Sequence, residues 1–185
     1  MQMNKRTQTV LLAIFLSVFM FFGIGPFYEG FSVIDKAKIS SLRSSKSSGL
    51  EQLHKILRSS RSLSAKMMAI SVSMDIRDES SIPVLIYEFS YKGRWWVRFW
   101  DYEEDYAVDA YRSFVSQELK KYGKKIIIPL KELMGQDDEL LRFWAVTSLA
   151  GVYNNKEFFE DVAVNDKGSS VRSQALHILQ HRFSE

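Results

Sequence analysis

A segment of helical pattern recurs in this chain with a fixed offset of 30 residues, and this repeat restricts the fold more than any other feature of the sequence. The stretch LLRFWAVTSLAGV (residues 140–152) aligns with SVRSQALHILQHR (residues 170–182). Three pairs of residues match at this offset: Arg142 with Arg172, Ala145 with Ala175, and Leu149 with Leu179. Apolar residues at intervals of three and four predict helices, and a period of this length is typical of stacked helical units.

Two further segments share parts of the pattern, and each of the four segments follows a shorter amphipathic stretch. Residues 96–108 contain the same Arg-Phe-Trp triplet as residues 142–144. Residues 64–74 place Lys66 and Ala69 in the same register. The shorter stretches cover residues 50–57, 82–91, 126–134 and 157–164. The sequence therefore predicts an all-α domain of about four helix pairs.

Prolines and turn residues mark the predicted helix boundaries. Pro83 and Pro129 stand near the start of two of the shorter stretches, where a missing N–H costs a helix little. The turns GQDDE (135–139) and NDKGSS (165–170) supply Asp, Asn, Gly and Ser, which favour N-caps and turn geometry.

One unit of the predicted repeat is irregular. The alignment matches Arg98 with Arg142, which are 44 residues apart rather than 30, and places Asp101 where the other units have alanine. We expect the extra length to form an insertion at about residues 105–123, in which apolar residues recur at helical intervals. The second helix of that unit is then either very long or followed by an extra helix.

A helix, a short acidic turn and a second helix with arginine near its start resemble HEAT repeats, especially the short type of phycobilisome-lyase-like proteins. The resemblance covers residues 49–185 and is clearest in IIIPLKELMGQDDELLRFWAVTSLAGV followed by DKGSSVRSQALHIL. It implies an α-solenoid of about four HEAT-like helix pairs, in which turn aspartates bond to helix arginines along the stack. By this resemblance the structural ladder residues are Asp137, Asp138, Arg142, Asp166 and Arg172.

The N-terminal region carries the pattern of a membrane segment. No formal charge occurs between Arg6 and Glu29, and residues 9–25 are almost wholly apolar, which is enough to span a bilayer as one helix. We expect an N-terminal tail (1–8), a transmembrane signal-anchor (9–26), a Ser/Lys-rich linker (27–48) and the repeat domain (49–185). Pro26 follows a small-residue site at residues 23–25 and disfavours cleavage there, although a cleaved signal peptide remains an alternative.

Flanking charges predict the orientation of this segment. Lys5 and Arg6 in the short tail favour an N-in topology with an extracytoplasmic (periplasmic or extracellular) C-terminal domain. Lys36, Lys38 and Arg43 on the other side oppose this orientation. Because the short tail usually decides, we expect a single-pass protein with its domain outside the cytoplasm.

Composition excludes several classes of chemistry. The chain has no cysteine, which rules out disulfides, thiolate metal sites and a cysteine nucleophile. A net charge of +3 is too small to imply a nucleic-acid partner, and none is expected. No phosphate loop or nucleophile elbow is present, so we expect no catalytic residue and no cofactor. His177 and His181 have metal-ligand spacing but fit a polar helix face better, so no metal site is expected.

The aromatic stretch KGRWWVRFWDYEEDY (92–106) is the strongest candidate for a binding site. Trp and Arg dominate protein-binding hot spots. We therefore predict that Trp95, Trp96, Arg98 and Trp100 contact a protein partner, itself a membrane or envelope protein, and that the chain is a non-catalytic, membrane-tethered scaffold. The alternative is a secreted or periplasmic ligand-binding protein or enzyme, for example one like a pigment lyase, that uses the aromatic insertion.

Overall fold

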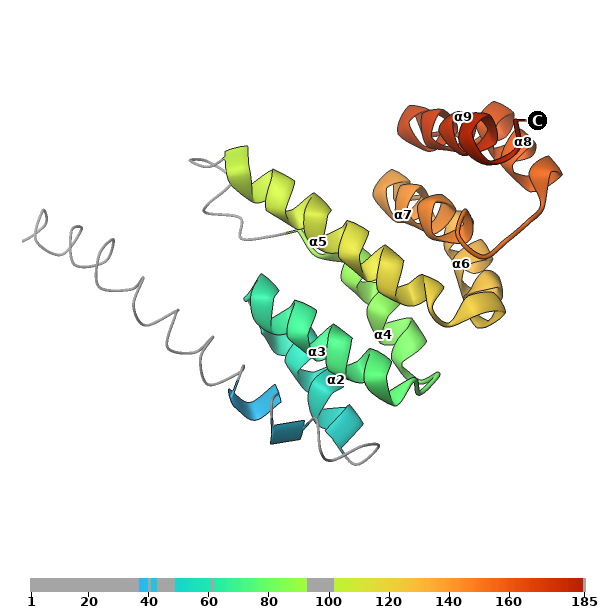
Figure 1. Ribbon diagram of the computed structural model, residues 1–185. Helices are drawn as coiled ribbons and strands as arrows, with labels where there is room; N and C mark the ends of the chain where they lie inside the picture. Colours follow the sequence, from blue (N-terminus) through green and yellow to red (C-terminus); the bar gives the residue numbers. More distant parts are fainter. Residues whose placement is uncertain (1–36, 40, 43–48, 61, 93–101, 185) are drawn as a thin grey trace, which may run out of the picture.

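The computed structural model describes residues 37–39, 41–42, 49–60, 62–92 and 102–184, which form helices and connecting loops without a β-strand (Figure 1). The prediction of an all-α fold is therefore confirmed. No helix among these residues is both long and apolar enough to cross a membrane. The predicted anchor (9–26) and the aromatic residues Trp95, Trp96, Arg98 and Trp100 lie outside the described residues.

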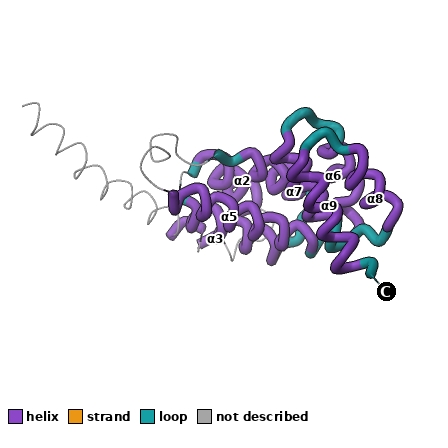
Figure 2. The backbone as a smooth tube through the Cα atoms, turned by 90° about the horizontal axis from the view of Figure 1, so that it is seen from above, coloured by secondary structure: helices purple, strands orange, loops and turns teal. Residues whose placement is uncertain are grey.

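Ten helical elements lie among the described residues after residue 49, and Figure 2 shows the helices as packed tubes. Two are single 3-10 turns, and the rest are α-helices. In chain order they are α2 (Leu50–Ser59), α3 (Leu63–Ile76), α4 (Ser81–Tyr87), η2 (Glu88–Ser90), α5 (Tyr102–Lys120), η3 (Gly123–Ile126), α6 (Ile127–Met134), α7 (Glu139–Leu149), α8 (Lys156–Asn165) and α9 (Ser169–Arg182).

Successive helices pack as pairs, and the second helices of the pairs pack on one another in chain order. The pairs are α2 with α3, α4 with α5, α6 with α7, and α8 with α9. Across the pairs, α3 contacts α5, α5 contacts α7, and α7 contacts α9 (Figure 1). The core therefore lies between the helices of each pair and continues from one second helix to the next.

Local signals in the sequence explain where the helices begin. Ser62, Asp138 and Asn155 are the N-caps of α3, α7 and α8, and each side chain accepts a backbone N–H from the first turn. Pro83 and Pro129 occupy the third position of α4 and α6, where no intrahelical N–H bond is lost.

Aromatic and alanine side chains fill the contacts between pairs. Phe89 of η2 stacks on Trp144 of α7 with ring centroids 6.1 Å apart. Ala69, Ala145 and Ala175 occupy matching places on α3, α7 and α9, and all three are fully buried. Because a methyl side chain takes little space, these positions let the second helices lie close to their neighbours.

The folded domain begins before residue 49, within the segment expected to be a linker. Ile39 and Leu42 are buried members of the hydrophobic core. Polar residues dominate this part of the sequence and suggested a spacer, but its apolar residues are spaced closely enough to reach the core together. Part of the 27–48 segment is thus part of the domain.

The irregular unit fits one of the two expected arrangements, a very long second helix (α5, 19 residues), but its register differs from the expectation. Residues 105–120 lie in α5, which packs against α3, α4 and α7, so they form the second helix of a pair rather than an insertion. The offset of 30 residues continues back through this helix, matching Arg112 with Arg142 and Leu119 with Leu149. The extra length precedes the repeat position in α5, because residues 91–101 separate η2 from α5 and α5 starts before Asp109, which corresponds to the first residue of α7.

Candidate functional site

Each second helix carries a basic side chain that lies near the hydrophobic core. This side chain donates a hydrogen bond to a backbone carbonyl of the same helix pair. We call these four residues the rung cations: Lys66, Arg112, Arg142 and Arg172. The carbonyl acceptors are Leu57 for Lys66, Phe89 and Tyr91 for Arg112, Gln136 and Asp137 for Arg142, and Asp166 for Arg172. Each cation thereby satisfies carbonyl groups that the end of the preceding helix leaves open.

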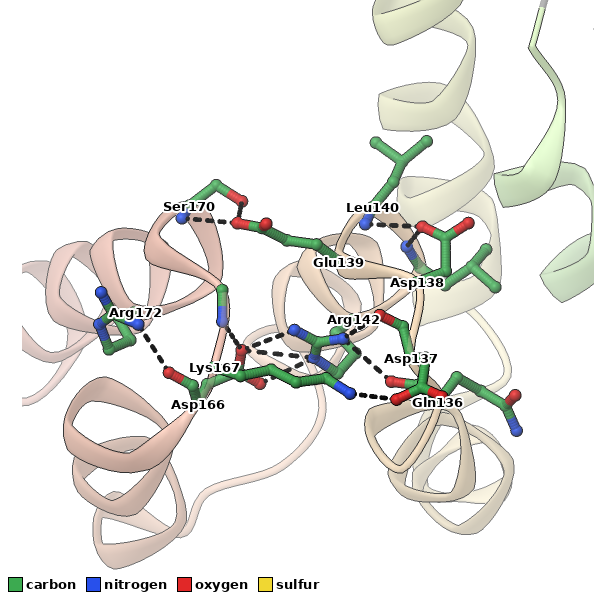
Figure 3. Close-up of polar contacts among 12 residues, drawn as sticks. Gln136, Asp137, Asp138, Glu139, Leu140, Arg142, Asp166, Lys167, Ser170 and Arg172 are labelled. Carbon is green, nitrogen blue, oxygen red and sulfur yellow. Dashed lines mark hydrogen bonds and ion pairs between the residues drawn. The ribbon is translucent and has the colours of Figure 1, made fainter.

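Arg142 also reaches the next pair, as Figure 3 shows. Its Nε donates to Asp166 Oδ2 at 3.0 Å and its Nη2 donates to Asp166 Oδ1 at 3.0 Å. Only 2% of the Arg142 side chain is exposed, so this ion pair joins α7 to the α8–α9 turn inside the protein. Burial alone raises the pKa of Asp166, but the hydrogen bonds from Arg142 and from the Gly168 N–H outweigh it and lower that pKa.

The other two predicted ladder aspartates have different contacts. Asp138 is the N-cap of α7, and its Oδ1 accepts the Leu140 N–H at 2.9 Å. Asp137 is exposed and pairs with Lys167 across the two turns (Figure 3). The side-chain hydrogen bond from Lys167 lowers the pKa of Asp137. Both turns are therefore held together at the surface as well as by the buried pair.

A second buried cluster joins the first pair to the second. Lys66 Nζ donates to Glu88 Oε2 at 2.7 Å, and the Tyr111 hydroxyl donates to the same oxygen at 2.8 Å. Burial lowers the pKa of Lys66 and raises that of Tyr111. Glu88 Oε1 is buried without a hydrogen-bond partner among the described residues. This cluster is enclosed by protein, so we regard it as a junction and not as a binding site.

An open hollow of about 470 Å³ crosses the row of second helices at α7. Its floor is apolar: Leu140 and Phe143 are half-buried, and Trp144 is 7% exposed and meets Phe143 edge-to-face at 5.3 Å. Asp109 of α5 lies at one edge, while Glu139 of α7 and Ser170 of α9 complete the lining. We call this feature the α7 hollow.

The edges of the α7 hollow carry negative charge held in place by local bonds. Asp109 accepts a hydrogen bond from Arg112 at 2.8 Å, and its side chain is 63% exposed. Glu139 accepts both the N–H and the hydroxyl of Ser170, and these bonds lower the pKa of Glu139. Gly168 permits this arrangement, because a Cβ there would lie 2.6 Å from the Glu139 side chain.

The α7 hollow joins an apolar floor to a polar rim, a combination typical of binding sites. Its floor is aromatic and aliphatic, and two carboxylates stand at the rim, one of which, Glu139, accepts the Ser170 hydroxyl at 2.7 Å. The rings of His177 and His181 lie 4.2 Å apart on α9. Across the described residues, no group of three or more His, Asp or Glu side chains is placed to hold a metal ion.

The sequence did not single out the residues of this hollow as a site. Leu140, Phe143 and Trp144 belong to the repeat, and their apolar character was attributed to the core. A signal was nevertheless present: in α9 the corresponding residues are Ser170, Ser173 and Gln174, so the repeat does not require apolar residues there. The chain matches no protein-family model, no curated protein and no solved structure.

Proposed function

We propose that this protein is a membrane-tethered α-solenoid of HEAT-like helix pairs that acts as a non-catalytic scaffold for another protein. The row of second helices and the rung cations support the solenoid architecture, because the most extensive contacts between helices lie within a pair or between neighbouring pairs. The apolar stretch at residues 9–25 supports the membrane anchor, with the domain on the extracytoplasmic side.

The α7 hollow is the observation that carries the binding role. An exposed apolar floor beside Asp109 and Glu139 suits an amphipathic helix whose apolar residues enter the hollow and whose lysines or arginines face the two carboxylates. We therefore assign the hollow to a basic amphipathic segment of the partner protein.

Site-specific photo-crosslinking in intact membranes tests this role. A photoreactive amino acid at position 140 should give a discrete protein adduct, whereas the same group at position 128 should give none, because Ile128 is 71% exposed on α6 outside the hollow. Neutralising the rim with Asp109→Asn and Glu139→Gln should reduce the adduct by about tenfold. Equal adducts from both positions, or an adduct indifferent to the rim charges, would exclude the assignment.

Topology needs its own measurement. With a C-terminal tag, the domain should resist protease added to the cytoplasmic side and be digested when the opposite side is opened. Digestion from the cytoplasmic side would overturn the orientation without affecting the hollow.

The size of the α7 hollow also favours a second candidate, a ligand-binding protein. A volume of about 470 Å³ lies within the range of small-molecule sites. Native mass spectrometry of the purified protein distinguishes the two, since a bound small molecule would add a defined mass that Phe143→Ala removes.

A further inference from the structure

The outer stripe of α9 repeats a surface that is buried on the other described second helices. On each second helix, the rung cation and the residues four and seven positions later share one stripe. On α5 the three residues are Arg112, Ser116 and Leu119, on α7 they are Arg142, Val146 and Leu149, and on α9 they are Arg172, Leu176 and Leu179. The first two sets are 0–6% exposed.

The α9 set is the exception. Leu176 is 49% exposed, whereas Val146 at the matching place is fully buried, and both Arg172 and Leu179 are half-buried. The difference follows from packing, because α5 and α7 are covered by the next second helix. Among the described helices, α9 packs mainly against α7 and α8, which lie on its other sides (Figure 1).

Arg172 lacks one of the contacts that Arg142 makes. Arg142 bonds to two carbonyls of its own turn and to the Asp166 carboxylate of the following pair. Arg172 makes only the first kind of bond, from Nη1 to the Asp166 carbonyl at 2.8 Å (Figure 3). In the described part of the chain Arg172 forms no ion pair, and the Asp166 carboxylate, which is bonded to Arg142, acts on it only through its charge.

The charge of α9 indicates which kind of partner surface can bind this stripe. The helix Ser169–Arg182 contains two arginines and two histidines and no acidic residue. We infer that the Arg172–Leu176–Leu179 stripe is a docking surface for a helix pair of a partner protein that carries a carboxylate in its turn, as the α8–α9 turn offers Asp166 to Arg142. This interface is separate from the α7 hollow and does not depend on the function proposed for it.

A duplicated helix pair provides a defined probe for this surface. Residues 155–184 are repeated once directly after Ser184 in the full-length protein, which places the repeated aspartate at the same distance from Arg172 as Asp166 has from Arg142, 24 positions. Because the chain has no cysteine, Leu176→Cys in the first copy introduces one thiol for maleimide labelling. Glu157→Cys, at an exposed position on α8, serves as the control.

We expect labelling at position 176 to slow by about tenfold or more in the extended protein, with little change at position 157. Replacing the repeated aspartate by asparagine, or Arg172 by glutamine, should restore much of the rate. Helix content from circular dichroism shows whether the added pair folds.

Three results would overturn the inference. The added pair can remain unfolded, or it can fold while labelling at position 176 stays within about twofold of the original rate. Alternatively, the unextended protein in detergent can protect position 176 in a concentration-dependent manner, with a doubled mass in light scattering. That last outcome would assign the stripe to a second copy of this chain.

Discussion

At the scale of single residues, the buried ion pairs set the energetics of the junctions. Lys66 and Glu88 are 4% and 1% exposed, so their charges have little water around them. Such a pair contributes little compared with a well-packed apolar pair, but removing one partner leaves a buried charge without compensation. Each junction is therefore more sensitive to a single substitution than to a matched double one.

We predict that Lys66→Met lowers the free energy of unfolding by about 3–5 kcal/mol, because Glu88 loses its counter-charge. The double variant with Glu88→Leu should recover part of that loss. Chemical denaturation measures both. The surface pair Lys125–Glu79, with side chains 58% and 62% exposed, is the matched control, and Lys125→Met should cost less than about 1 kcal/mol. Equal losses at the two pairs would contradict the role of burial.

The Arg142–Asp166 pair makes stability depend on pH in a defined direction. The folded protein lowers the pKa of Asp166, so its stabilising effect is complete above the unfolded pKa of about 3.9 and is lost as pH falls through the folded value. Asp166→Asn should therefore flatten the decline of stability between about pH 5 and pH 2. The exposed Asp161→Asn on α8 is the comparison, and thermal unfolding across this pH range provides the measurement.

At the scale of elements, a side-chain N-cap marks the start of two of the second helices, α3 and α7. Asp138→Ala removes the acceptor for the Leu140 N–H at the start of α7 and should cost about 1 kcal/mol. Gln136→Ala in the same turn is the control, because Arg142 uses only the Gln136 backbone carbonyl. A loss for Gln136→Ala as large as for Asp138→Ala would mean that the turn, and not the cap, is sensitive. Unfolding midpoints in denaturant distinguish the two explanations, provided that the dependence of the free energy of unfolding on denaturant concentration is the same for both variants.

At the scale of the whole molecule, position within the row determines what a residue can tolerate. Val146 and Leu176 occupy the same place on α7 and α9, but they are 0% and 49% exposed. Val146→Asp should lower the free energy of unfolding by about 3 kcal/mol or more, since it buries a charge between helices. Leu176→Asp should change it by less than about 1 kcal/mol. Similar losses at both sites, measured by urea denaturation, would show that the α9 stripe is covered.

The helix boundaries could be predicted because local chemistry sets them. Asp138, Pro129 and the three-to-four spacing of apolar residues act within one turn of helix, and outside the irregular unit the described helices lie in the expected places. The register of the irregular unit could not be predicted as easily. Because the Arg-Phe-Trp triplets are identical, the sequence comparison matched Arg98 with Arg142. The residues around Arg112 are less similar to those around Arg142, and its role is visible only from the carbonyls it contacts.

Contacts between residues that are far apart in the sequence could not be predicted. Lys66 was placed in the correct register, but its partner Glu88 comes from the next pair, and no spacing rule connects them. The α7 hollow likewise depends on how α5, α7 and α9 lie against one another. Such arrangements follow from packing across units, which a single sequence does not specify.

Arg112 bonds to a carbonyl that is distant in the sequence, and this affects where residues can be inserted into the chain. Arg142 and Arg172 each donate a hydrogen bond to a backbone carbonyl six positions away in the sequence. Arg112 donates to the carbonyl of Phe89, which is 23 positions away. Closing the longer loop costs only about 1 kcal/mol more in chain entropy. Since Arg112 holds Phe89 directly against α5, we expect a change in chain length between Tyr91 and the start of α5 at Tyr102 to leave the order of the helix row intact. New sequence can thus be added at this point of the chain without rebuilding the domain around it.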